Sequence, residues 1–196
     1  MICPPIPLTS LTNDIAALSR ALERTSGPVV LAGHAYAGAV IAATPDKRVK
    51  SLVYVAALAP DEGETVAKVF YRDEASPEQP KMVPDPNGFV WMPEDAFCRA
   101  LAHKASADQA SIAAAVQRPI AVQCIQEPVP RPAWKTKPTW FLVAEEDRMI
   151  NPKTQHFMAE RMRANVRTYP VDHTPMYTEP DLVIDVILEA ARETLS

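Results

Sequence analysis

The stretch Val29-Val30-Leu31-Ala32-Gly33-His34-Ala35-Tyr36-Ala37-Gly38 decides the fold. It begins with a short apolar run that does not alternate with polar residues, which favours a strand covered on both faces, as in a parallel sheet. The small residues from Gly33 to Gly38 then predict a tight turn, and the apolar residues 39–43 predict a short buried helix. The sequence therefore predicts a buried strand that turns sharply into a buried helix.

Strands and helices alternate along the chain on both sides of this turn. Further buried strands are expected at residues 52–56, 140–144 and 165–169. Helices are expected at residues 94–103, 107–117 and 152–163, and from Pro180 onward. A further helix is expected before the first strand. There Ser10 can act as the N-cap, and an apolar face follows it, formed by Leu11, Ile15, Leu18 and Leu22. This alternation with short links predicts the α/β class, a mostly parallel sheet with flanking helices.

Proline divides the chain into a regular frame and an irregular insert. Twenty of the 196 residues are proline, about twice the usual share, and they concentrate between Pro60 and Pro138. We expect a Pro-rich helical cap at residues 61–137, with residues 1–60 and 138–196 forming the two parts of the core. Such an insert would lie over the carboxyl ends of the strands, where sheets of this kind place their ligands.

Composition and charge exclude several classes of protein. Apolar residues are 47% and charged residues 22%, which is ordinary for a folded soluble chain. The net charge of −4, without a Lys/Arg cluster, argues against binding to nucleic acid. Neither a membrane span nor a signal peptide is evident, and three scattered cysteines fit no disulfide framework. We expect a cytoplasmic protein that uses no cofactor and no metal, because no such motif is present.

Gly33-His34-Ala35-Tyr36-Ala37 resembles the nucleophile elbow of the α/β-hydrolases, written G-x-S-x-G. Glu145-Glu146-Asp147-Arg148 follows a later strand, where that family places its catalytic acid, and Asp172-His173 follows the next one, where it places its histidine. The resemblance covers nearly the whole chain and is closest to small bacterial esterase-like members. It implies that Asp147 is the acid, with Glu145 and Glu146 as alternatives, and that His173 is the base.

Ala35 departs from the family pattern, because it stands where the family has its serine. A methyl group can neither attack a carbonyl carbon nor donate a proton to histidine. Ala35 is either a natural loss or an engineered substitution, and Ala37, at the position of the final glycine, speaks for natural loss. The resemblance thus implies a carboxylic-ester hydrolase ancestry with impaired serine chemistry.

The beginning of the chain is a second departure. The family has strands before the first amphipathic helix, including one whose following loop supplies an oxyanion N–H. Nothing comparable precedes Ser10, whereas the second oxyanion donor, the backbone N–H of Tyr36, is present. Without those strands residues 29–32 become an exposed edge. We expect residues 1–7 or a second copy of the chain, in a homo-oligomer, to cover it.

Three functions remain open from the sequence. The first is the impaired esterase, acting on a small apolar ester-like molecule. The second is an Asp–His general-base enzyme of non-hydrolytic type, a lyase or a cofactor-free oxygenase-like protein, and the third is a non-catalytic, ligand-binding pseudo-hydrolase. The substrate-binding residues that we expect are His34, Tyr36, Trp91 and Phe97.

Each of these residues also has a purely structural interpretation. His173 could cap a loop, Asp147 could neutralise Arg148, and His34 could simply pack in the turn. The aromatic residues of the insert could form a small hydrophobic cluster with Phe89 and Met92. We further expect Cys98 to be a buried small hydrophobe, and His103 and His156 to be solvated on helix faces.

Overall fold

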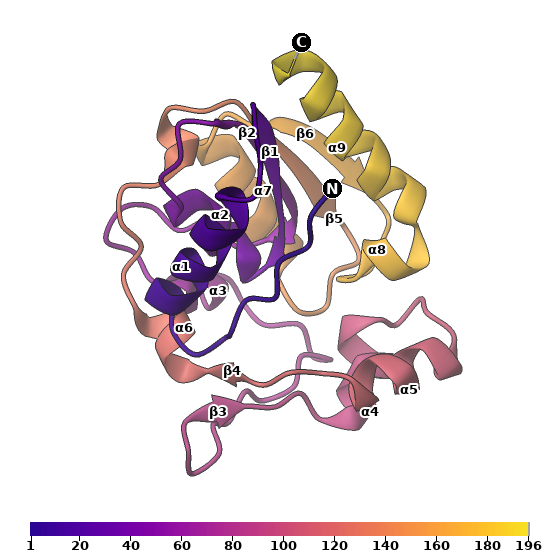
Figure 1. Cartoon of the computed structure of the whole chain (residues 1–196). Coiled ribbons are helices and arrows are strands. Elements are labelled where there is room, and N and C mark those ends of the chain that lie inside the picture. Colours follow the sequence, from indigo (N-terminus) through magenta and orange to yellow (C-terminus); the bar gives the residue numbers. More distant parts are fainter. Residues whose placement is uncertain (196) are drawn as a thin grey trace.

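Four parallel strands form the main sheet of the computed structural model, which describes residues 1–195. Their order is β1-β2-β5-β6 (Figure 1). The strands are β1 (Val29–Ala35), β2 (Val49–Ala57), β5 (Thr139–Ala144) and β6 (Asn165–Tyr169). Every neighbouring pair is parallel, which confirms the predicted α/β class and mostly parallel sheet.

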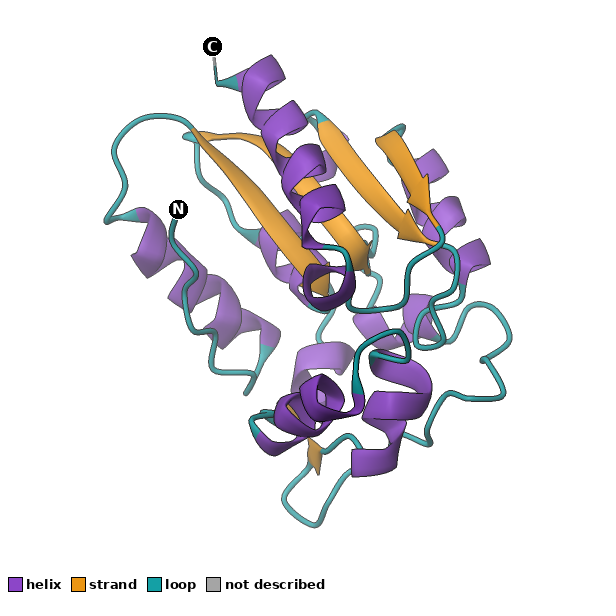
Figure 2. Ribbon diagram, turned by 90° about the vertical axis from the view of Figure 1, so that its right-hand side faces the viewer, coloured by secondary structure: helices purple, strands orange, loops and turns teal. Residues whose placement is uncertain are grey.

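Helices cover both faces of this sheet (Figure 2). One face carries α9 (Pro180–Thr194), and the other carries α2 (Ala37–Ala43) and α7 (Pro152–Arg161), with α1 (Leu11–Leu22) against α2. Successive strand residues alternate between the two cores, so that Tyr54 packs on the α2 side and Val55 on the α9 side. The central strands are therefore apolar throughout. None of the helices in residues 1–195 is long and apolar enough to span a bilayer.

The insert of residues 61–137 consists of short elements, most of which lie below the sheet in Figure 1. Its elements are α3 (Val66–Phe70), β3 (Phe89–Val90), α4 (Glu94–Ala96), a π-helical turn (Phe97–Leu101), α5 (Ala107–Ala115), β4 (Ile120–Ala121), α6 (Val122–Gln126) and a 3₁₀ turn (Ala133–Lys135). The two predicted helices of this segment are present, although the first is split and ends in the π-helical turn.

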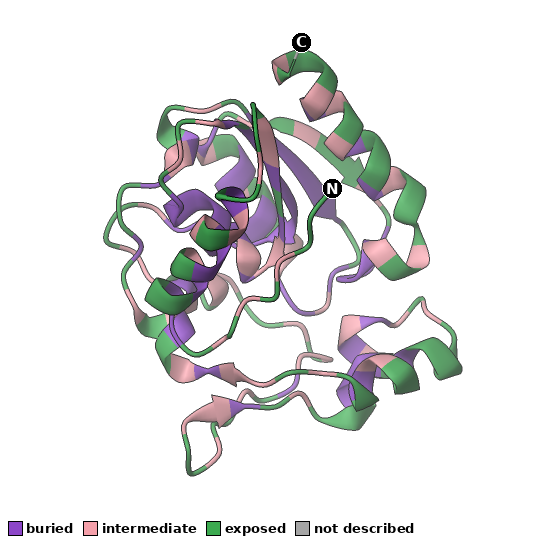
Figure 3. Cartoon of the chain, in the orientation of Figure 1, coloured by how far each residue is buried: buried purple, intermediate pink, exposed green. Residues whose placement is uncertain are grey.

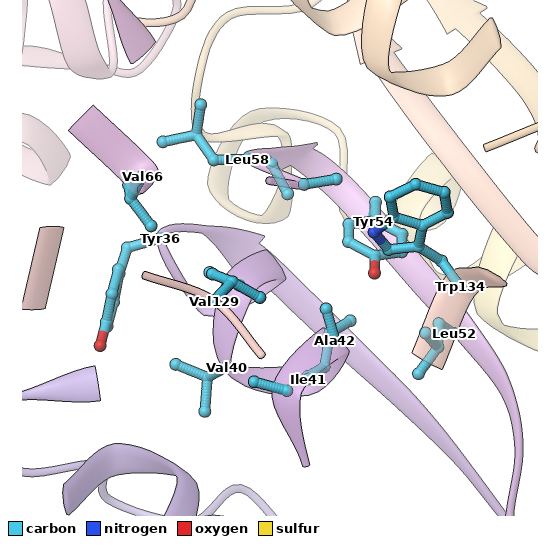
Figure 4. Close-up of a cluster of buried hydrophobic side chains, with 14 of the residues drawn as sticks. Tyr36, Val40, Ile41, Ala42, Leu52, Tyr54, Leu58, Val66, Val129 and Trp134 are labelled. Atoms are coloured by element: carbon cyan, nitrogen blue, oxygen red, sulfur yellow. The ribbon is translucent and has the colours of Figure 1, made fainter. Parts of the chain in front are cut away.

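The insert shares the larger of the two cores with the frame. Figure 4 shows Tyr36 and Val40, from the turn and α2, beside Val66 and Val129, from the insert. Figure 3 shows the buried residues on the strands and on the inward helix faces, with exposed residues outside. Because these side chains exclude water together, the insert is anchored to the frame by burial of apolar surface.

The first helix starts where the sequence predicts it. The Ser10 hydroxyl accepts a hydrogen bond from the Asn13 N–H at 3.0 Å, as an N-cap does. Just before it, Leu8 adopts a left-handed backbone with φ of 59°. Its N–H donates to Asp14 Oδ1 at 2.7 Å, and its carbonyl accepts from the Ala121 N–H at 2.9 Å. Leu8 thus joins α1 to the insert.

Strand β1 is the outer strand of the described sheet, with β2 as its partner. Ala32 in its middle is exposed. In the part of the chain that the structure describes, no backbone hydrogen bond joins residues 1–7 to β1, so these residues do not add a strand to the sheet. Cover by a second chain stays a prediction.

Candidate active site

The turn between β1 and α2 is tight at both of its glycines. A Cβ atom on Gly33 would lie 2.7 Å from the Ala37 carbonyl oxygen, and one on Gly38 would lie 2.4 Å from the Leu58 carbonyl oxygen. Between them Ala35 has a left-handed backbone, with φ of 49°. Such strain persists in a non-glycine residue only where the surrounding structure enforces it, and it is typical of functional sites.

Asp147 and His173 meet at the carboxyl ends of the strands. Nδ1 of His173 lies 2.8 Å from Oδ2 of Asp147, and the two side chains are 5% and 0% exposed. Because a carboxylate oxygen only accepts hydrogen bonds, Nδ1 carries the proton of the neutral imidazole. Nε2 then has a free lone pair and can act as a base.

A buried network holds the Asp147 carboxylate in place. Its Oδ1 accepts from the N–H groups of Met149 and Ile150 at 2.7 and 2.9 Å, and its Oδ2 accepts from Nε2 of Gln155 at 2.7 Å. Gln155, fully buried on α7, also accepts from the Ala144 N–H. In the sequence, the only signal for Gln155 is a polar residue on the buried face of an expected helix, which does not identify it as a partner of Asp147.

The two alternative acids point elsewhere. Glu145 lies 2.6 Å from Nε2 of His156, and Glu146 lies 2.9 Å from Nζ of Lys104. Both carboxylates are therefore engaged by surface side chains, and Asp147 is the carboxylate that contacts His173.

His34 and Asp172 hold the loop that carries His173. Nε2 of His34 donates to the His173 carbonyl oxygen at 2.7 Å, and the two rings lie 4.6 Å apart. Burial and the neighbouring His173 ring lower the pKa of His34 to about 3, so His34 stays neutral. Asp172 accepts from the N–H groups of Thr174 and Lys104, and so ties this loop to the insert.

A cavity of about 680 Å³ lies between the turn and the insert, and Ala35, His34 and His173 line it together. The rest of its wall is mostly apolar and includes Phe97 and Met92 from the insert. A volume of this size is typical of sites for small organic ligands. The structure thus places the methyl group of Ala35 and the ring of His173 on one cavity.

Tyr36 also lines this cavity, and a buried carboxylate anchors it. Its hydroxyl donates to Oδ2 of Asp14 at 2.8 Å, and burial, with that hydrogen bond, raises the pKa of Tyr36 above its usual range. Asp14 is fully buried and also binds the Leu8 N–H. This contact between Asp14 and Tyr36 could not be predicted from the sequence, because the two residues are 22 positions apart.

Trp91 is a correction to the expected set of ligand-binding residues. It is 50% exposed and does not line the cavity, whereas Met92 and Phe97 do. Val90 is buried, and Trp91 next to it points to solvent because neighbouring residues of an extended chain face opposite sides. Phe89 packs against the main core instead.

Two expectations about burial are also wrong. Cys98 is exposed, because Phe97 and Ala100 occupy the buried positions of the π-helical turn. The side chain of His103 is only 9% exposed, so it does not lie on a solvated helix face. His156 is half-exposed and pairs with Glu145, as a residue on an outer helix face does.

A second cavity, of about 800 Å³, is shallow and lined by charged side chains on the other side of the Asp147 loop. Two of its acids have side-chain partners, Glu145 with His156 and Glu146 with Lys104. Within residues 1–195, no group of three or more His, Cys, Asp or Glu is arranged to hold a metal ion. The apolar cavity beside His173 is therefore the candidate active site.

Residues 4–186 match the sequence model of the alpha/beta hydrolase family. An alpha/beta hydrolase of Aspergillus novofumigatus, nvfD, is 24% identical over 208 residues, which cover 98% of this chain and 82% of that protein.

Several solved structures have the same fold. Polyneuridine aldehyde esterase superposes with a TM-score of 0.73 at 14% identity, over 94% of this chain and 80% of that one. A pyrethroid hydrolase from Sphingobium faniae JZ-2 gives 0.78 at 19% identity, over 94% and 78%. A histidine-to-alanine variant of tomato methylketone synthase I, in complex with beta-ketoheptanoate, gives 0.74 at 16% identity, over 94% and 79%. With the family model matching most of its length, this chain belongs to the alpha/beta hydrolase family.

Proposed function

We propose that this chain derives from a carboxylic-ester hydrolase and that Ala35 has removed its serine-dependent activity. The observation that carries the proposal is the Asp147–His173 hydrogen bond beside the cavity that Ala35 also lines. The names of two structural neighbours, an esterase and a pyrethroid hydrolase, support the ancestry.

The proposed loss follows from the chemistry of acyl transfer. A serine at this position would give its proton to Nε2 of His173 while its oxygen attacked the carbonyl carbon of an ester. The backbone N–H of Tyr36 would then stabilise the oxyanion. Ala35 has neither the proton nor the lone pair, and removal of a triad member lowers the rate by about 10⁴-fold or more.

The Ala35→Ser variant tests this proposal. We expect it to hydrolyse short p-nitrophenyl esters far faster than the native chain, because Asp147, His173 and the Tyr36 N–H would serve as acid, base and oxyanion donor. Ala37→Ser is the matched control, since it adds the same hydroxyl two residues away, and His173→Ala should abolish the gain. No increase in a folded Ala35→Ser variant would contradict the proposal.

A second candidate function is decarboxylation of a β-keto acid, a lyase reaction that needs no nucleophile. Ala35 favours this reaction, because its methyl group has no atom that could attack a carbonyl carbon, whereas His173 could still act as a base. The likeness to methylketone synthase I, whose structure was solved in complex with beta-ketoheptanoate, supports it.

In this reaction the bond between the carboxylate carbon and the α carbon breaks and CO₂ leaves. The electron pair forms an enolate, whose oxygen would accept a hydrogen bond from the Tyr36 N–H. One proton, passed from solvent through His173, then adds to the α carbon and gives the methyl ketone.

Methyl ketone formation from β-ketooctanoate, measured above the spontaneous rate, tests this candidate. We expect His173→Ala to lower that rate by about 10²- to 10⁴-fold, the usual contribution of acid–base catalysis. Saturable binding of the keto acid without turnover would instead favour a ligand-binding pseudo-hydrolase.

A further inference from the structure

Arg118 is the single Lys, Arg, Asp or Glu side chain among the residues that line the apolar cavity. The other polar side chains of the wall include His34, His173 and Gln117. Gln117 is engaged, because its side-chain amide bonds to both the N–H and the carbonyl of Met92. A fixed positive charge in so apolar a wall needs an explanation.

Arg118 lies where the segment before α1 contacts the insert. Its Nη2 donates to the Ile6 carbonyl oxygen at 2.6 Å, and Ile6 lines the same cavity. A few residues away, the Ala121 N–H binds the Leu8 carbonyl oxygen. Arg118 is an exposed residue that also lines the cavity, which places it where the cavity meets solvent.

Arg118 has no acidic partner within the described residues 1–195, since no carboxylate oxygen lies within 4.0 Å of it. Arg131 and Arg163 likewise have no acidic partner among these residues, whereas Arg118 is the arginine that lines the cavity. A guanidinium has five N–H donors in a planar fork that matches a carboxylate. The bond to Ile6 uses one donor and restrains the group, so the others remain for a ligand.

We propose that the cavity selects apolar compounds that carry one carboxylate, and that Arg118 binds this carboxylate. The apolar body of the ligand would lie along the insert wall, where Met82, Met92 and Phe97 line the cavity. Methionine side chains adapt to ligands of different shape. The cavity would therefore select its ligand by the carboxylate and accept apolar groups of different shapes. The inference rests on the proposed function only in taking this cavity as the ligand site, and it holds for either reaction.

Octanoate and octanamide are the matched probes for this inference, because they share their chain and differ in charge at neutral pH. Affinities are measured by isothermal titration for the native chain and for Arg118→Gln, Arg118→Lys and Arg131→Gln. Arg131 is the control, since it is an exposed arginine of the insert that does not line the cavity.

We expect the native chain and Arg131→Gln to bind octanoate roughly 3- to 10-fold more tightly than octanamide, the range of a partly solvated ion pair. Arg118→Gln should abolish this preference through weaker octanoate binding, with octanamide affinity unchanged, and Arg118→Lys should keep part of it. Equal binding of the two probes to the native chain, or a preference that survives in Arg118→Gln, would overturn the inference alone. Failure of both probes to bind the native chain would overturn it together with the proposed use of the cavity.

Discussion

Ala35 occupies a backbone conformation that favours glycine, with φ of 49°. Its methyl group adds strain without adding chemistry. We predict that Ala35→Gly raises the free energy of unfolding by about 0.5–1 kcal/mol, because relief of the strain exceeds the entropy that glycine gains in the unfolded chain. Urea unfolding measures the change. The control is Ala43→Gly in helix α2, which should lower stability by about 0.5–1 kcal/mol. Equal losses in both variants would refute the strain at Ala35.

His34 should make the protein less stable in acid. Its pKa of about 3 in the folded chain lies below the ordinary value of 6.5, so the unfolded chain binds the proton first. The contribution of neutral His34 to the free energy of unfolding is then fully present above about pH 6.5. The free energy of unfolding falls by up to about 1.4 kcal/mol per pH unit as the pH drops from there toward about 3. Burial also lowers the pKa of His103, which adds to this loss.

The measurement is the free energy of unfolding at about pH 7 and about pH 5. We expect the difference between the two pH values to shrink in His34→Gln, because the titrating group is gone. In His156→Gln it should stay near the native value, since His156 is half-exposed. If His34→Gln lost as much unfolding free energy on acidification as the native chain does, the assignment of this loss to His34 would be contradicted.

At the scale of elements, Asp14 connects α1, the Gly33–Gly38 turn and the segment before α1. Asp14→Ala would leave the buried Tyr36 hydroxyl and the Leu8 N–H without their acceptor. We predict a loss of about 3 kcal/mol or more in unfolding free energy, because each unsatisfied buried group costs about 1–3 kcal/mol. Asp185→Ala, an exposed acid on α9, should change stability by less than about 0.5 kcal/mol. Similar values for the two variants would show that the Asp14 network contributes little.

The long elements could be predicted from the sequence, and the short ones of the insert only in part. Helix α1 has a regular apolar face and a serine cap, and β5 is apolar throughout, so their patterns leave little choice. In the insert, strand β3 has only two residues. A shift of the strand pattern by one residue decides whether the side chain of Trp91 or that of its neighbour faces the cavity. Cys98 lies in a π-helical turn, whose residue spacing differs from that of an α-helix. The α-helical spacing therefore predicts the wrong side for its side chain.

The whole sheet has two outer strands of very different character. Strand β6 carries the polar residues Asn165, Arg167 and Thr168, whereas β1 begins with four apolar residues. Polar and charged side chains protect an edge from pairing, and apolar edges invite it. We therefore predict that the native chain self-associates through β1.

Sedimentation velocity over a range of concentrations tests this prediction. Ala32→Lys places a charge on the exposed middle of β1 and should shift the protein toward monomer without unfolding it. Thr168→Lys on the opposite edge is the control and should leave the association unchanged. A native chain that sediments as a monomer at every concentration would count against the prediction.

Across the whole molecule, the sequence order of Ala35, Asp147 and His173 led to the candidate site through the family resemblance. Its supports could not be found in this way. Gln155, Asp14 and Arg118 act through contacts with residues that only the folded chain brings near, such as the Arg118 bond to Ile6. Local spacing contains no signal for such pairs, because tertiary packing decides which polar side chains are turned inward.

The four hydrogen bonds on the Asp147 carboxylate have a consequence for how this protein could evolve. They form without any contribution from residue 35, so mutation at that residue does not disturb them. Alanine and serine codons differ by a single base, GCN against TCN. One transversion would therefore place a hydroxyl on the cavity that His173 also lines, without disturbing the contacts that hold the Asp147 carboxylate.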